Sequence, residues 1–271
     1  MYASRPPCPA LRPWVRLLWA GTPSPAAAPQ REHVLPMGTM HLALRLDGPP
    51  LRVFAGPSDI AGTVIGRAVV GGARDTFYVR ETGLAGSSVG AQLEPAAARA
   101  LLGASAESLA GRHTLLEDLW PSTAALLVEQ LQAAGSASLR MALLEKHLLA
   151  KLRTAPAIHP AAAAALASLR AGSRVADAVR ASGLSHRHLV LRLRDATGLA
   201  PAQHLRLLRL QQVLKALRQP QAELAQVAAD AGYADQAHFT RDFRALTGLT
   251  PGAWKEARPT HTHHVPVGPA R

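Results

Sequence analysis

The sequence predicts an α+β protein in which a β-rich N-terminal domain with trailing helices precedes an all-α domain. Three observations support this prediction. Apolar and polar residues alternate between glycine and proline clusters over residues 1 to about 117. Apolar residues then recur at helical spacing from Leu115 to Leu152. Finally, a helical segment in the second half of the chain occurs twice, and such a repeat defines the architectural unit.

Composition places the chain among globular proteins. Its 271 residues suffice for two domains with separate cores, and 48% hydrophobic against 18% charged residues excludes a disordered chain. The single cysteine, Cys8, excludes an intrachain disulfide and a cysteine-based zinc finger. No apolar stretch reaches about 18 residues, and the first 19 residues lack the continuous apolar core of a signal peptide. We therefore expect a cytoplasmic protein with no membrane partner.

The first half of the chain contains the strand patterns. Alternation is clearest at Met40–Leu46, Leu51–Phe54 and Thr76–Arg80, with glycine and proline clusters between them. Pro95 to Leu102 predicts a short helix, and Gly135-Ser136 separates two further helices within Leu115–Leu152. We expect a domain over residues 1–153, a linker near Thr154-Ala155-Pro156, a second domain over 157–258 and a disordered tail over 259–271.

The repeat lies in the second domain. TGLAP at 197–201 recurs as TGLTP at 247–251, an offset of 50, and Val175-Ala176-x-Ala178-x₄-Gly183-Leu184 recurs at an offset of 49 as Leu224-Ala225-x-Val227-x₄-Gly232-Tyr233. Each copy predicts a helix, a tight glycine turn, a second helix that stops at glycine, and then a proline. This is the pattern of a helix-turn-helix. Two tandem copies, the first unit (174–198) and the second unit (223–248), indicate DNA binding.

The local residues predict how each unit is built. Ser185 and Asp235 are suitable N-caps for the second helix of each unit, which we call the reading helices. Leu189 and Leu193 in the first unit are replaced by Phe239 and Phe243 in the second, and we expect all four to face inward together with Trp254. Pro201 to Leu217 predicts one long helix that joins the units. That helix would set the reading helices roughly 34 Å apart, one turn of DNA, on one face of a duplex.

The outward sides of the reading helices carry polar residues of the types that read DNA. Glutamine pairs bidentately with adenine and arginine with guanine, while threonine or histidine contacts bases or phosphates. For each residue the alternative is an ordinary exposed polar side chain, and Arg206 and Arg209 are expected to be phosphate contacts or solvated charges. The candidates are Arg187, His188, Arg192 and Arg194 in the first unit, and Gln236, His238, Thr240, Arg241 and Arg244 in the second.

The charge is concentrated where the repeat begins. The chain has a formal net charge of +12. Residues 170–218 contain ten Arg or Lys against two acids, a net charge of +8, whereas residues 219–258 have a net charge of −1. A charge run alone is most often a solvated helix face. Over a helix-turn-helix repeat, however, it indicates a surface that attracts phosphate.

The second unit resembles the signature of the AraC/XylS family of bacterial transcription regulators. The resemblance is carried by Ala231-Gly-Tyr-Ala-Asp-Gln-Ala-His-Phe-Thr-Arg-Asp-Phe-Arg244 and by Thr247-Gly-Leu-Thr-Pro-Gly-Ala-Trp254, and it covers about residues 157–258. It implies base readers at Gln236, His238, Thr240 and Arg241. The first unit departs from the family pattern, because Leu191 stands where a base-reading arginine is frequent and Arg192 lies one place further on.

The first half is similar to the N-terminal domain of a subset of these regulators. The similarity is carried by Trp14-x₄-Trp19, by Glu32-His33-Val34-Leu35-Pro36-Met37-Gly38, and by the later segments 116–120 and 144–148. It implies a cupin-like β-barrel followed by helices, with a role in sensing an effector or in dimerisation.

His33 and His41, or His261 to His264, could be metal ligands, but a cupin metal site needs more converging ligands than the chain offers. Structural or surface histidines are the simpler interpretation. Cys8 has no placed base to activate it. We therefore expect no metal, no cofactor and no catalytic residue.

The sequence therefore predicts a sequence-specific transcription regulator that binds double-stranded DNA at an operator or promoter. Its further expected partners are RNA polymerase, a small-molecule effector and a second copy of the chain. Two other classes stay open: an enzyme or effector-binding module that uses the DNA-binding domain for targeting, and an architectural protein without sequence preference. The first would need a polar constellation within residues 1–150, and the sequence contains none.

Overall fold

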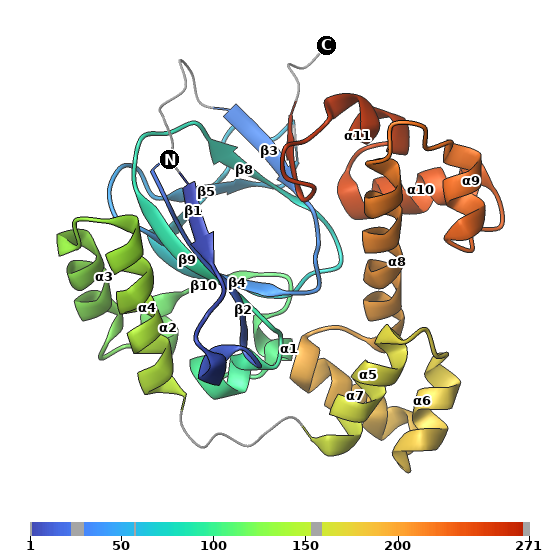
Figure 1. The fold of residues 1–271 in the computed structure, drawn as a ribbon, viewed down its shortest axis with the longest axis horizontal. Helices are drawn as coiled ribbons and strands as arrows, with labels where there is room; N and C mark the ends of the chain where they lie inside the picture. The colour runs from blue at the N-terminus through green and yellow to red at the C-terminus, as the bar shows by residue number, and fades with distance from the viewer. Residues whose placement is uncertain (1, 23–29, 57, 153–158, 268–271) are drawn as a thin grey trace.

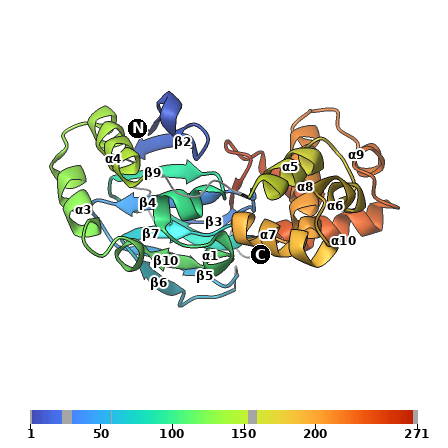
Figure 2. The ribbon, with the colours of Figure 1, turned by 90° about the horizontal axis from the view of Figure 1, so that it is seen from below.

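The computed structural model describes residues 2–22, 30–56, 58–152 and 159–267 (Figure 1). It confirms the predicted α+β architecture, with two antiparallel sheets and trailing helices followed by a helical part. Figure 2 shows the β-rich part and the helical part side by side. The linker expected at 154–156 lies outside the described residues.

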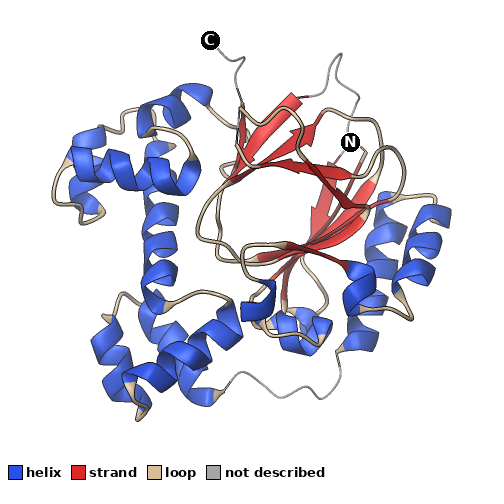
Figure 3. Cartoon of the chain, turned by 180° about the vertical axis from the view of Figure 1, so that it is seen from behind, coloured by secondary structure: helices blue, strands red, loops and turns tan. Residues whose placement is uncertain are grey.

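Two sheets form the N-terminal domain and face each other (Figure 3). The first has the strand order β1-β2-β9-β4-β7-β10 and the second β11-β3-β8-β5-β6, and all pairs are antiparallel. The strands are β1 (Tyr2–Arg5), β2 (Val15–Gly21), β3 (Gln30–Val34), β4 (Met40–Arg45), β5 (Leu51–Phe54), β6 (Thr63–Gly66), β7 (Ala68–Gly71), β8 (Tyr78–Thr82), β9 (Ser88–Leu93), β10 (His113–Leu115) and β11 (His264–Pro266).

The alternation read from the sequence is visible in β4. Met40, Leu42 and Leu44 are fully buried, whereas the residues between them are half-buried. Successive side chains of a strand point to opposite faces, so one face of the sheet is completely covered by the core. Helix α4 (Ala137–Lys151) packs against β2 and β9 of this sheet.

The helices between the sheets and the repeat are more broken than predicted. The helix expected at Pro95–Leu102 is the short π-helix η2 (Ala98–Leu102), and the segment 115–152 holds α2 (Leu116–Leu119), α3 (Ala124–Ala133) and α4. Pro121 cannot donate a backbone hydrogen bond, so α2 cannot run into α3. Two further short helices are η1 (Pro9–Leu11) and α1 (Ala106–Leu109). In the part of the chain that the structure describes, every helix is too short or too polar to cross a membrane.

The helical part contains the long helix that the sequence predicts at Pro201–Leu217. Its helices are α5 (Pro160–Arg170), α6 (Val175–Ser182), α7 (His186–Thr197), α8 (Pro201–Leu217), α9 (Leu224–Asp230), α10 (Gln236–Thr247) and α11 (Pro251–Ala257). Gly183 and Gly232 make the two turns with φ of +67° and +74°, a region that favours glycine. The side chains of Ser185 and Asp235 accept hydrogen bonds from the backbone N–H three residues later, as N-caps do.

The two units are buried in different cores. Leu189 and Leu193 of α7 pack with α5 and α6 in a small cluster of their own. Phe239 and Phe243 of α10, together with Trp254, belong to the large cluster that also fills the N-terminal domain. The second unit is therefore continuous with the N-terminal domain, whereas the first unit has a separate core.

The predicted disordered tail is corrected at its described end. Residues 264–266 form β11, which pairs with β3 through the register Val265 to His33, and Val265 is fully buried. The three prolines and three histidines of residues 259–271 suggested disorder. Pro266, however, lies at the end of an edge strand, where the missing N–H costs no ladder bond.

The contrast between Leu189 and Leu191 tests the core of the first unit. Leu189→Ala should lower the free energy of unfolding by about 2–5 kcal/mol, because Leu189 is fully buried. Leu191→Ala on the same helix is the matched control and should change it by less than about 0.5 kcal/mol, because Leu191 is 47% exposed. Urea unfolding measures both. Equal losses would contradict the inward placement of Leu189.

Candidate nucleic-acid interface

The outward face of α10 follows from its buried face. Consecutive residues of an α-helix are 100° apart, and Arg241 lies two places from both Phe239 and Phe243, which are fully buried. Arg241 therefore projects from the side of α10 opposite the core. Gln236 and Arg244 are also exposed. Among the described residues none of these three side chains has a hydrogen-bond or ion-pair partner, so all three are free to bind.

Two other predicted readers on α10 make contacts within the protein. The Thr240 hydroxyl donates to the carbonyl of Gln236 at 2.8 Å. The His238 ring is exposed, but its edge packs on Tyr233 with the ring centroids 5.3 Å apart. The Thr240 oxygen keeps a lone pair and the His238 ring keeps its nitrogens, so both can still accept or donate, from positions fixed by the helix.

In the first unit an apolar residue occupies the equivalent central position. Leu191 lies two places from both Leu189 and Leu193, as Arg241 does from its phenylalanines, and it is 47% exposed. Arg187, His188 and Arg194 are exposed on either side of it. Arg192 is exposed but lies about a quarter turn around the helix from Leu191. From the sequence, Leu191 was interpreted only as a departure from the family pattern, in a position where a base-reading arginine is frequent. The 50-residue repeat offset, which aligns Leu191 with Arg241, was the signal that places it at the centre of the face.

Two arginines expected to contact phosphate or solvent are used inside the protein. Arg206 Nε lies 2.7 Å from Asp242 Oδ1, and the Arg209 guanidinium stacks over the Tyr233 ring. The Tyr233 hydroxyl donates to the other oxygen of Asp242 at 2.8 Å. Burial and this hydrogen bond raise the pKa of Tyr233, so its phenol stays protonated as a donor. These contacts fix α8 to the turn and reading helix of the second unit.

The C-terminal end of α10 is held by the N-terminal domain. The carbonyls of residues 245–247 accept hydrogen bonds, in that order, from Thr76 Oγ1 (3.3 Å), Phe77 N (2.9 Å) and His33 Nδ1 (3.0 Å). The last carbonyls of a helix have no partner within it. Burial lowers the pKa of His33, so the ring is neutral and one nitrogen carries the proton for Thr247. His33, one of the metal-ligand candidates, is thus a structural donor.

The end of α7 also lies against the N-terminal domain, beside α1 (Figure 1). Arg99 forms an ion pair with Asp195, and its Nε donates to that carboxylate at 3.0 Å. The α-carbon of Gly198 faces the backbone carbonyl of Ala106, and a Cβ there would lie only 2.8 Å from that oxygen. Both reading helices are therefore anchored at their C-terminal ends.

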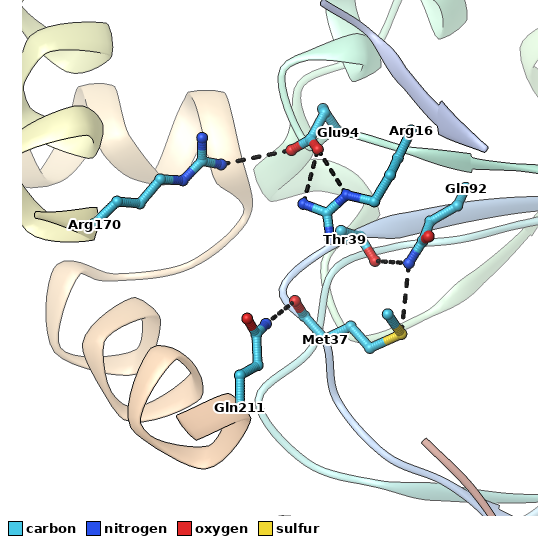
Figure 4. Close-up of polar contacts among 7 residues, drawn as sticks. All are labelled: Arg16, Met37, Thr39, Gln92, Glu94, Arg170 and Gln211. Carbon is cyan, nitrogen blue, oxygen red and sulfur yellow. Dashed lines mark hydrogen bonds and ion pairs between the residues drawn. The ribbon is translucent and has the colours of Figure 1, made fainter. Parts of the chain in front are cut away.

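Helix α8 is bound to the same domain between these two anchors. Gln203 donates to Asp75 at 2.6 Å, and Gln211 donates to the carbonyl of Met37 at 2.8 Å (Figure 4). The helix that joins the units thus makes polar contacts to the N-terminal domain at two points along its length.

Two further metal-ligand candidates, His41 and His264, make other contacts. His41 packs against the rings of Tyr78 and His113. His264 Nδ1 lies 2.8 Å from Glu32, which also pairs with Arg80. Burial alone would raise the pKa of Glu32, but Arg80 and His264 lower it to about 2. Within the described ranges no group of three His, Cys, Asp or Glu side chains is arranged to hold a metal ion.

Two family models match separate parts of the chain. Residues 178–257 match the family described as "Helix-turn-helix domain", and residues 3–114 match a domain of unknown function, DUF6597. No curated protein matches the chain.

Among solved structures, ToxT from Vibrio cholerae is 9% identical, with 94% of this chain and 98% of that chain covered and a TM-score of 0.45. A regulator with an AraC-type DNA-binding domain from Chromobacterium violaceum is 22% identical over 37% of this chain and 94% of that chain, with a TM-score of 0.35. A probable AraC family regulator from Rhodopseudomonas palustris is 21% identical over 37% of this chain and all of that chain, with a TM-score of 0.33.

The family match and the paired units define the protein as a DNA-binding transcription regulator. Its helix-turn-helix domain is of the AraC type, which confirms the resemblance found in the sequence of the second unit.

Alanine substitutions at two glycines of the second unit separate the effect of the contact with the N-terminal domain from the effect of backbone strain. Gly248 and Gly232 have nearly equal φ, +75° and +74°, but a Cβ on Gly248 would lie 2.5 Å from Phe77 and 2.8 Å from His33, whereas nothing lies within 4 Å at Gly232. Gly232→Ala should cost about 1 kcal/mol or more of backbone strain. Gly248→Ala should cost more, because the two aromatic rings must also move. Urea unfolding of both variants checks this, and equal losses would show that the interface does not resist the added methyl group.

Proposed function

We propose that α7 and α10 enter two successive major-groove segments of one DNA duplex, with α8 as the rigid connection between them. In a helix-turn-helix the second helix lies in the groove and its N-terminal residues contact base edges. The DNA-binding domain would span residues 157–258, with the first unit at 174–198 and the second at 223–248. The observation that supports this proposal is that each reading helix has an anchored C-terminal end and an outward face whose central residue, Leu191 or Arg241, is exposed and has no hydrogen-bond or ion-pair partner among the described residues.

In the second unit, Gln236 and Arg241 are the direct base readers. Both are exposed and free, and both have the hydrogen-bonding geometry for a bidentate contact, glutamine to adenine and arginine to guanine. His238 and Thr240 are supporting contacts, since the protein already fixes their orientation. Arg244, three residues beyond Arg241, is placed to contact the phosphate backbone.

In the first unit, Leu191 is an apolar reader. Its central place on an exposed face suits contact with the 5-methyl group of thymine, which is the apolar feature of the major groove. Arg187 and His188 lie near the start of the helix, where base or phosphate contact is made. Arg192 and Arg194 then supply charge to the phosphates. The two units would accordingly favour different base compositions.

The N-terminal domain, over residues 1–153, has the regulatory role in this proposal. It holds the C-terminal ends of both reading helices and the joining helix, so any change in its shape alters the placement of the two units relative to each other. A small-molecule effector or a second copy of the chain would act through these contacts. RNA polymerase is the proposed partner at the promoter, and the protein would act in the cytoplasm on the nucleoid.

Selection of bound fragments from a random DNA pool tests the function itself. The whole chain should enrich a non-palindromic site with two short segments about one helical turn apart. Enrichment without a shared motif would instead support an architectural protein that binds any duplex. The number of copies of the motif in each fragment would also report whether two chains bind together.

Arg241→Ala should weaken binding to the selected site by about 1–3 kcal/mol and binding to random DNA by far less. Arg112→Ala is the matched control, because Arg112 is also exposed but belongs to the N-terminal domain. Titration of both variants against the two duplexes measures the difference. An equal loss on selected and random DNA would reject Arg241 as a base reader.

Replacing thymine by deoxyuracil in the segment bound by the first unit tests Leu191. Loss of the methyl group should weaken binding by about 0.8 kcal/mol, the value of one buried methylene-sized group. In Leu191→Ala the same replacement should have little effect, since the apolar contact is already gone. An identical uracil penalty in wild type and variant would contradict a methyl contact by Leu191.

A further inference from the structure

A cavity of about 350 Å³ lies between the N-terminal domain and the first unit. Its walls come from the segment after η1, from the segment that follows β9, and from α5, the end of α7 and the buried side of α8. Pockets that bind small molecules measure about 300–1,000 Å³ and are mostly apolar with a few polar groups. Pro13, Pro95, Ala163, Leu166 and Ala167 form the apolar part of this cavity.

His204 is an unsatisfied polar group in this wall. It extends from α8, is only 7% exposed, and neither ring nitrogen has a hydrogen-bond partner among the described residues. Burial and the nearby Arg170 lower the pKa of His204, so the ring is neutral and offers one donor and one acceptor. Buried polar side chains in proteins are nearly always hydrogen-bonded, and each exception calls for a partner.

The charged groups around the cavity are unbalanced. Glu94 is the one acid in the wall, and it is already paired with Arg16 at 2.8 Å and with Arg170 at 3.5 Å (Figure 4). Arg12 also lines the cavity, and its guanidinium has no partner in the described parts of the chain. The cavity wall therefore holds two arginines, Arg12 and Arg170, against one carboxylate, which leaves net positive charge there.

We propose that this cavity binds a small monocarboxylic acid with an apolar body. The carboxylate would pair with Arg12 and the free side of Arg170, where arginine offers the bidentate geometry that carboxylates accept. The neutral His204 ring would donate its N–H to the carboxylate, and the apolar body would lie against the alanines and Leu166 of α5.

A bound acid would contact both the N-terminal domain and the DNA-binding domain, the two parts that the regulatory proposal couples. The cavity touches the N-terminal domain through Arg12 and Glu94, and it touches the DNA-binding domain through α5, Thr197 at the end of α7 and His204. Occupancy would hold the first unit, which has its own separate core, in one position against the N-terminal domain. This coupling to DNA rests on the function proposed above, whereas binding of the acid does not.

Calorimetric titration of the whole chain with hexanoate tests the binding, with acetate and hexanol as probes of the charge alone and of the apolar body alone. Hexanoate should bind saturably and at least about tenfold more tightly than either control, since both the ion pair and the apolar contact contribute. Ala167→Phe fills the cavity from an exposed position on α5 and should weaken hexanoate binding by about tenfold or more.

Two variants separate the site from general effects. Ala164→Phe, on the same helix but outside the cavity wall, should bind hexanoate as the wild type does. Arg12→Gln should lose the preference for hexanoate over hexanol, whereas Arg112→Gln should keep it. The absence of saturable binding, equal effects of the two phenylalanine variants, or acetate binding as tight as hexanoate would each overturn the proposal.

The coupling is measured with the DNA site selected from the random pool. Hexanoate should change the affinity for that site in the wild type and in Ala164→Phe, but not in Ala167→Phe. Unchanged affinity in the presence of calorimetrically confirmed hexanoate would overturn the coupling and leave the binding site established. Failure of the chain to select any DNA would instead reject the proposed function, because the calorimetric result does not depend on it.

Discussion

Hydrogen bonds from the N-terminal domain to the C-terminal end of α10 are the constraint on which the rest of the arrangement depends. A helix ends with carbonyl groups that it cannot satisfy itself, and they need partners when the end is buried. Here the partners are Thr76, Phe77 and His33, which come from two segments of the N-terminal domain. The second reading helix is thus completed by another domain, and its outward face stays uncovered.

The two units share a sequence pattern but differ in how firmly they are held. The core of the second unit merges with that of the N-terminal domain, and Arg206, Asp242 and Tyr233 join it to α8. The first unit packs its own small core and meets the N-terminal domain at the end of α7 and across a cavity. We therefore expect motion between the domains to involve the first unit. Its core is small and separate, so the first unit can move with the least loss of buried surface.

Local sequence patterns predicted the caps, turns and buried faces of helices well, but they did not predict contacts between residues that are distant in the sequence. The caps Ser185 and Asp235, the turn at Gly232 and the inward phenylalanines were all readable, since each depends on neighbours within a few positions. The roles of His33 and of β11 were not readable, because each depends on a partner more than 200 residues away. The exposed arginines of the candidate interface could be named from the sequence. Arg206 could be distinguished from them only in the structure, which shows its ion pair with Asp242.

The pairing of β3 with β11 brings residues 30–34 beside residues 264–266. A ribosome releases the chain from its N-terminus, and domains generally fold in that order. In this protein one edge of the second sheet waits for residues 264–266, which follow both reading helices in the chain, so the domain that is synthesised first is completed after the helical part has been made. Until then β3 presents an unpaired strand edge, the kind of surface on which nascent chains associate, and β11 covers that edge once it pairs.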